Sequence, residues 1–128
     1  MPFAQLDGLP FILPSAPNGL RTALDALARQ ERITLEVVME ADSLPLQKSL
    51  VAQERLYTVL PIHAVWQEVA DRRVQAARIV RPGMQRTVAM AIARSKGPPR
   101  AVRAVASRLV DIVADMAARG MWRAGSGE

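Results

Sequence analysis

The chain has 128 residues, of which 50% are apolar and 23% are charged. This composition suits one compact unit with a buried core and excludes a compositionally disordered chain. The chain contains no cysteine and a single histidine, His63, which excludes disulfide scaffolds, thiol nucleophiles and cysteine-ligated metal sites. No apolar run is long enough to span a membrane, and the amino terminus lacks the residue order of a signal peptide. We therefore expect a cytoplasmic protein without metal, cofactor or membrane contact.

The net charge of +5 is unevenly distributed along the chain. Residues 1–60 carry five basic against seven acidic side chains, whereas the remaining residues carry twelve basic against five acidic ones. A basic carboxyl-terminal half is compatible with a nucleic acid partner. However, its arginines are spaced singly and do not alternate with aromatic residues that could stack on bases. This pattern favours solvated faces, so we expect no direct DNA contact from this segment.

The first part of the chain alternates strand and helix signals. Residues 11–13 (FIL) form a short apolar run closed by a proline-rich turn, which predicts a buried strand. From Leu20 the apolar residues recur every three or four positions, which predicts a helix ending near Glu31 with Asn18 as its cap. Residues 35–39 (LEVVM) predict a second strand.

The next segment repeats the alternation. Asp42 or Ser43 can cap a helix whose buried stripe we predict from three apolar residues, namely Leu46, Leu50 and Val51. Residues 56–60 (LYTVL) predict a third strand, and Pro61 is expected in the first turn of a short helix. We expect Trp66 of that helix to lie in the core.

The last third of the chain departs from this rhythm. Residues 74–80 are expected to be extended, and residues 86–93 predict a further strand. Gly97, Pro98 and Pro99 form a stop, after which residues 100–119 predict the longest helix, ended by Gly120. The tail from residue 121 is expected to be disordered.

Short connections between alternating strands and helices imply parallel strands with right-handed crossovers. The predicted fold class is therefore α/β, with a small, mainly parallel sheet flanked by helices.

Several motifs in their order along the chain resemble the effector-binding domain of LysR-type transcriptional regulators. The matching runs are Leu9 to Pro14, Gly19 to Arg21, Glu40 to Ser43, Tyr57 to Pro61 and Ile79 to Pro82. One departure is the absence of glycine from the turn at Glu54 to Leu56, where many family members have one. The resemblance covers about Leu9 to Met116.

The resemblance implies a periplasmic-binding-protein-like lobe and a division of the chain. Residues 1–10 would be a leader and residues 11–80 the second lobe. Residues 81–120 would return to the first lobe through the strand at 86–93 and the long helix. The winged helix-turn-helix that reads DNA in the family would lie outside this chain. An apolar helix face without its lobe is an association site, so we expect a homo-oligomer.

Candidate ligand-binding residues follow from the carboxyl ends of the predicted parallel strands, where open α/β sheets bind ligands. In the family the corresponding loops face the cleft between lobes. The resemblance therefore implies contacts to a small, often anionic effector from Ser15, Asp42, Ser43, Thr58 and His63. Ser43 and Asp42 are also explained as helix caps, and Thr58 as a residue that fills the sheet.

The predicted function is effector sensing in a LysR-type regulator, without catalysis. Two other interpretations stay open. One is a self-associating α/β interaction module without a ligand. The other is a small α/β enzyme, which is disfavoured because the chain has no nucleophile elbow, P-loop or dinucleotide fingerprint.

Overall fold

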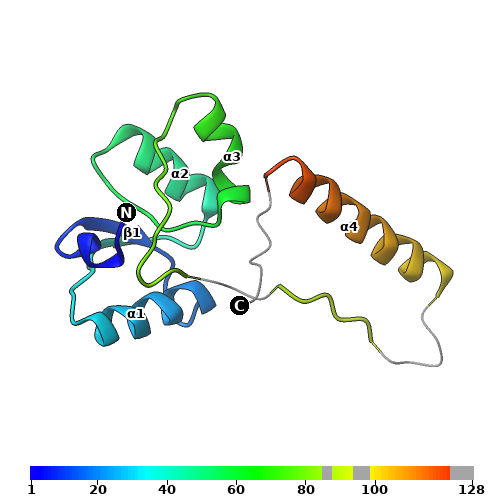
Figure 1. The fold of residues 1–128 in the computed structure, drawn as a ribbon, viewed down its shortest axis with the longest axis horizontal. Helices are drawn as coiled ribbons and strands as arrows, with labels where there is room; N and C mark the ends of the chain where they lie inside the picture. Colours follow the sequence, from blue (N-terminus) through cyan, green and yellow to red (C-terminus); the bar gives the residue numbers. More distant parts are fainter. Residues whose placement is uncertain (85–87, 94–98, 122–128) are drawn as a thin grey trace. The chain divides into compact units, whose positions relative to one another are not determined.

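The computed structural model describes residues 1–84, 88–93 and 99–121. The chain divides into two compact units, Met1–Met84 and Gln85–Glu128. The first unit contains the sheet, the hydrophobic core and three of the four α-helices, and the second contains the fourth (Figure 1). The assignment of these parts to two lobes stays a prediction.

The sheet is built around one buried strand, β1 (Pro10–Leu13), which pairs in parallel with β2 (Glu36–Glu40). On its other side β1 meets Tyr57, whose N–H donates to Pro10 O and whose carbonyl accepts from Ile12 N, each at 2.9 Å. The third strand expected at residues 56–60 is thus reduced to one parallel bridge. Pro14, directly after β1, has no N–H with which to extend this ladder toward Val59.

β2 lies at the edge of the sheet and is more exposed than its apolar sequence indicates. Val37 packs partly against the core, while Val38 and Met39 are 49% and 43% exposed. An irregularity in the pairing between Phe11 and Ile12 places one extra residue in β2. The second predicted strand is confirmed, but only part of it is buried.

Helix α1 (Gly19–Glu31) confirms the first predicted helix and its cap. The side chain of Asn18 accepts from the N–H groups of Leu20, at 2.9 Å, and Arg21, at 3.4 Å. The helix buries Leu20, Leu24 and Ala28. These residues are four positions apart and therefore share one helix face.

Helix α2 (Leu44–Gln53) begins after Ser43, whose Oγ accepts from Leu46 N at 3.5 Å. The buried stripe predicted for this helix is wrong, since none of its three residues is fully buried, and Leu50 and Val51 are half-buried. Leu46 is 46% exposed, and the fully buried side chain is its polar neighbour Gln47. Gln47 occupies the interior because its amide has hydrogen-bond partners there, as the site below shows. The turn at Glu54, where many members of the resembled family have a glycine, needs no left-handed residue there, since Glu54 has φ −113°.

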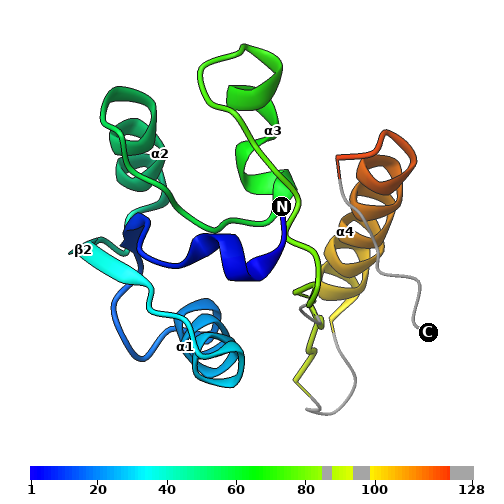
Figure 2. The same cartoon turned by 60° about the vertical axis from the view of Figure 1, so that its left-hand side comes forward.

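Helix α3 (Ile62–Ala70) confirms the short helix after the third strand segment, with Pro61 as its N-cap residue rather than in its first turn. Trp66 was expected in the core and is 39% exposed. The helix covers the sheet only loosely, as none of its residues is fully buried. Figures 1 and 2 show α1 on one side of the strands and both α2 and α3 on the other.

Residues 1–10 are part of the core and not a separate leader, which corrects the expected boundary. They form a short 3₁₀ helix, η1 (Phe3–Leu6), in which Phe3 and Leu6 are 0% and 2% exposed. Val80 donates to Met1 O at 2.9 Å and accepts from Phe3 N at 3.0 Å. The end of the extended stretch at residues 74–80 therefore holds the amino-terminal residues in place within unit 1.

The second unit contains helix α4 (Arg100–Ala118), which confirms the predicted long helix. Gly120 follows it at φ +72°, a left-handed conformation that glycine adopts without strain. The strand predicted at 86–93 is wrong for residues 88–93, which form no strand. A strand needs a hydrogen-bonded neighbour, and no described segment pairs with these residues. The rest of that prediction and the tail after Met121 lie outside the described residues.

We predict that replacing Phe3 with alanine lowers the free energy of unfolding by about 3–5 kcal/mol, because it leaves a cavity in the core. The matched control, Leu46→Ala, changes it by about 1 kcal/mol or less, because nearly half of that side chain is already exposed to solvent. Urea unfolding followed by circular dichroism measures both. Equal losses in the two variants would contradict the observed burial.

Candidate functional site

The loops that follow β1 and β2 meet at the carboxyl edge of the sheet. Leu13 O accepts from Ala41 N at 2.9 Å, which carries the pairing just past β2. Beyond it, Asp42 Oδ1 accepts from the backbone N–H of Ser15 at 2.9 Å. Asp42 is exposed and Ser15 is half-buried. Two of the predicted site residues are thus in direct contact, although they are 27 positions apart.

The sequence left open whether Asp42 or Ser43 caps α2, and the structure gives the two residues different roles. Ser43 caps α2, while the Asp42 carboxylate bonds to the Ser15 loop. The Ser43 hydroxyl is therefore engaged at the start of α2, at the same edge of the sheet. A bound molecule would meet a hydroxyl that already accepts from Leu46 N.

Gln47 connects the third paired segment, through Thr58, to this edge, a role that no sequence pattern above predicts. Its Nε2 donates to Ala41 O at 2.6 Å, and its Oε1 accepts from Thr58 Oγ1 at 3.2 Å. Gln47 is 3% exposed, so both ends of its amide need such partners. Thr58 is placed beside the other loops through this buried amide. The available sequence signal was its position three residues from both Leu44 and Leu50, on the helix face that carries these leucines.

Arg21 is the second residue that the sequence analysis left without a role. Its Nη1 donates to Pro14 O at 3.2 Å and to Glu40 Oε1 at 2.7 Å, and its Nε contacts Asp25 at 3.1 Å. The bond to Glu40 is the main cause that raises the pKa of Arg21, against a lowering by burial. The guanidinium therefore joins α1 to the ends of both strands. Its sequence signals were the spacing of Arg21 and Asp25, one helical turn, and its place in the run Gly19 to Arg21.

His63 lies in the first turn of α3 and is half-buried. The structure thus links four of the predicted residues through named bonds, namely Ser15 with Asp42, and Ser43 and Thr58 through α2. The participation of His63 stays a prediction, as does effector contact by the other four.

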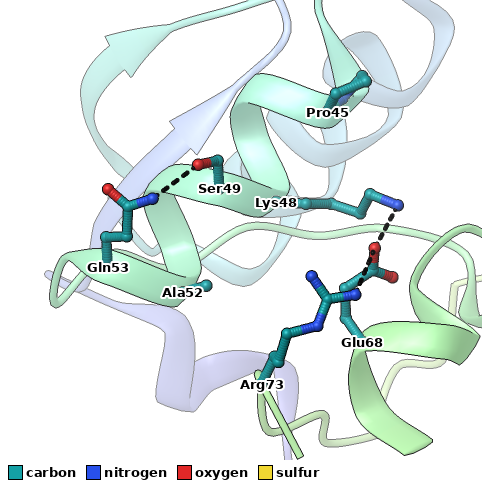
Figure 3. A pocket seen from close by; sticks show the side chains of 7 residues that line it. All are labelled: Pro45, Lys48, Ser49, Ala52, Gln53, Glu68 and Arg73. Carbon is teal, nitrogen blue, oxygen red and sulfur yellow. Dashed lines mark hydrogen bonds and ion pairs between the residues drawn. The ribbon is translucent and has the colours of Figure 1, made fainter. Parts of the chain in front are cut away.

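A separate pocket of about 420 Å³ lies between α2 and the end of α3 (Figure 3). Lys48 Nζ contacts Glu68 Oε1 at 2.6 Å, and Arg73 Nη2 approaches the same oxygen at 3.7 Å. The hydrogen bond from Lys48 is the main cause that lowers the pKa of Glu68. Glu68 Oε2 is buried and has no hydrogen-bond partner among the described residues. This ionic cluster holds α3 against α2.

Two kinds of site are not found in the part of the chain that the structure describes. It contains no group of three or more histidine, cysteine, aspartate or glutamate side chains arranged to hold a metal ion. None of its helices combines the length and the apolar character needed to cross a membrane.

Comparison with known families decides the relationship. The family model described as LysR substrate binding domain matches residues 1–114. The chain belongs to this family. Neither the curated proteins nor the solved structures contain a match to it. The LysR substrate-binding domain implies a periplasmic-binding-protein-like α/β fold, and the parallel β1–β2 pair with its flanking helices is consistent with that fold. The family belongs to regulators and not to enzymes.

We predict that Gln47→Leu lowers the free energy of unfolding of this LysR-family domain by about 1–3 kcal/mol, because it leaves the Ala41 carbonyl and the Thr58 hydroxyl without their partner. The same change at Gln53, whose amide bonds to Ser49 at the surface, costs less than about 0.5 kcal/mol. Denaturant titration of both variants checks this difference. A stabilised Gln47→Leu variant would show that the amide bonds are dispensable.

The lowered pKa of Glu68 predicts a pH dependence of stability. Its ionised form is favoured by folding, so its contribution is complete above the ordinary carboxyl value of 4.5 and is lost as the pH falls through the folded pKa. In Glu68→Gln the free energy of unfolding therefore falls less steeply as the pH decreases below 4.5. Lys48→Met has the same effect, because Lys48 supplies the main cause. Thermal unfolding across acidic pH measures this, and an unchanged pH dependence in both variants would refute it.

Proposed function

We propose that the chain is the effector-sensing part of a LysR-type regulator in the cytoplasm, and that it takes a small anionic effector at the carboxyl edge of the β1–β2 sheet. The observation that carries this proposal is the Asp42–Ser15 hydrogen bond, which brings two strand-end loops together. The family membership supports a sensor rather than a catalyst.

The electrostatics of this edge support an anionic ligand. Three helices begin directly after the three paired segments, with α1 starting at Gly19, α2 at Leu44 and α3 at Ile62. The amino-terminal end of a helix carries a partial positive charge and favours anions. Because the paired segments are parallel, these helix starts follow the same edge of the sheet. Asp42 and Glu40 oppose this field, and their carboxylates are held by Ser15 N and Arg21.

The roles of the predicted residues follow from this geometry. Ser15 offers a hydroxyl at the edge, and Asp42 positions the Ser15 loop through its backbone N–H. Thr58 lies at the same edge, but it donates its single hydroxyl proton to Gln47 Oε1, so toward a ligand it can act only as an acceptor or through its methyl group. Ser43 acts chiefly as the cap of α2, and His63 would contribute from the start of α3. In a complete LysR-type regulator, closure of the other lobe over this edge would shift the balance between arrangements of the DNA-binding parts.

The proposal is tested by nuclear magnetic resonance titration of the chain with a panel of small mono- and dicarboxylates. We expect saturable amide shifts at residues 15, 43 and 58 with at least one member of the panel. Ser15→Ala weakens that binding severalfold because it removes a hydroxyl at the edge and leaves the Asp42 bond to the backbone N–H of residue 15 in place. The control Ser49→Ala, in the pocket beside Glu68, leaves it unchanged.

Two outcomes would overturn the proposal. In one, no member of the panel shifts any amide at the carboxyl edge. In the other, the shifts cluster around Lys48 and Arg73, which would place anion binding in the pocket between α2 and α3.

A further inference from the structure

The pocket beside Glu68 lies within unit 1 and shares no residue with the carboxyl edge of the sheet. One of its walls is a single face of α2, since the residues there are three and four positions apart, namely Pro45, Lys48, Ser49 and Ala52. The opposite wall comes from Glu68 of α3 and from Arg73 beyond its end. Two helices that are separate in the sequence therefore supply the polar groups of one cavity.

The way in which α3 ends places Arg73 at this cavity. Arg73 N donates to Glu68 O at 2.8 Å, and Arg72 N donates to Val69 O at 3.1 Å. Arg72 adopts the left-handed conformation, with φ +57°. These two backbone bonds and the left-handed residue form a common helix ending. The ending brings the chain back along α3, so that Arg73 Nη2 lies 3.7 Å from Glu68 Oε1.

The Glu68 carboxylate is used on one side only. Its Oε1 accepts from Lys48 Nζ at 2.6 Å and faces Arg73 as well. Its Oε2 is buried and has no partner in the part of the chain that the structure describes, although the whole side chain is only 12% exposed. A buried carboxylate oxygen is costly to leave without a donor. A molecule in the pocket that carries an N–H or O–H group would satisfy this oxygen.

The two cations beside Glu68 have donors left for a negatively charged group. An ammonium has three N–H donors and a guanidinium has five. The contacts of Lys48 are confined to Glu68 Oε1, and Arg73 makes only long contacts, 3.7 Å to Glu68 and 3.5 Å to Asp71. The pocket thus offers donors for an anionic group close to an oxygen that needs a donor.

The remaining lining is mixed in character. Ser49 Oγ accepts from Gln53 Nε2 at 2.9 Å, which leaves the hydroxyl proton of Ser49 to donate. Pro45 and Ala52 add apolar surface to the α2 wall, as does the aliphatic stem of Lys48. The volume of about 420 Å³ is within the range of about 300–1,000 Å³ that is usual for small-molecule pockets.

The charges of the cluster select a ligand without net charge. The cations Lys48 and Arg73 are offset by two carboxylates, Glu68 and Asp71, which contact them. A simple carboxylate would add a negative charge beside Glu68 and would leave Oε2 without a donor. A simple amine would satisfy Oε2 but leave the spare donors of both cations unused. A zwitterion meets both requirements at once.

We propose that the pocket between α2 and α3 binds a small zwitterion, an α-amino acid with an aliphatic side chain. The ammonium group of the ligand donates to Glu68 Oε2, and its carboxylate accepts from Lys48 and Arg73. Its side chain lies against Pro45 and Ala52. This site is independent of the effector site proposed above, because none of the carboxyl-edge residues lines it.

The probe is L-leucine, titrated into the full chain and followed by nuclear magnetic resonance. We expect saturable shifts of the amides of residues 48, 49, 68 and 73. Two analogues each lack one of the charged groups: isocaproate has no amino group, and isoamylamine has no carboxylate. Both bind at least about tenfold more weakly than L-leucine, because each loses one charge-assisted set of hydrogen bonds.

Substitution of the polar groups tests their roles. Glu68→Gln and Arg73→Gln each weaken the binding of L-leucine by about tenfold. Arg73 is 57% exposed, so Arg73→Gln keeps the fold even if Glu68→Gln is less stable. The matched control is Arg29→Gln, which makes the same change of charge on the exposed surface of α1. It leaves the affinity within about twofold of the unmodified chain.

Four outcomes would overturn the proposal. Isocaproate that binds the pocket as tightly as L-leucine would show that the cations alone suffice. Equal losses in Arg29→Gln and Arg73→Gln would show that only net charge matters. The absence of any shift with L-leucine would leave Glu68 Oε2 to solvent. Shifts with L-leucine at residues 15, 43 and 58 alone would place the amino acid at the carboxyl edge, which contradicts this proposal and leaves the effector site standing.

Discussion

The pairing of β1 on both sides is the constraint on which the rest of unit 1 depends. Phe11, Ile12 and Leu13 are at most 1% exposed, so the backbone groups of this strand cannot turn to water. β2 satisfies one side, and the Tyr57 bridge satisfies the other. Since both neighbours run parallel to β1, their carboxyl ends meet at one edge. The position of the candidate site therefore follows from the need to give the backbone groups of one buried strand their hydrogen-bond partners.

Two polar side chains hold the loops at that edge together, where apolar packing ends. Gln47 joins the Ala41 loop to Thr58, and Arg21 joins Pro14 to Glu40. A buried amide is tolerated only when its donor and acceptor are both engaged, and Gln47 meets this condition. These bonds hold together loops from distant parts of the sequence. The site thus rests on residues that need not touch a ligand themselves.

The two units differ in where their apolar residues lie. Unit 1 buries Phe3, Leu6 and Leu24 together with β1 in one core. Helix α4 has no fully buried residue, and its ends coincide with local signals, Pro99 before it and the left-handed Gly120 after it. A helix needs only its own backbone bonds, whereas a strand needs a neighbour. This explains why α4 forms as predicted while residues 88–93 do not form their expected strand.

The sequence by itself determined the features that depend on neighbouring residues. These are the cap at Asn18, the four α-helices, the two strands and the family resemblance, which the comparison with LysR substrate binding domains confirmed. The choice of Ser43 over Asp42 as the cap of α2 came from the structure. Tertiary structure alone decided burial, because contacts from distant segments choose among residues that look equivalent locally. It placed Gln47 inside and Trp66 at the surface, and it brought the expected leader into the core through Phe3. Local patterns fix hydrogen bonds within one segment, while burial is fixed by what packs against it.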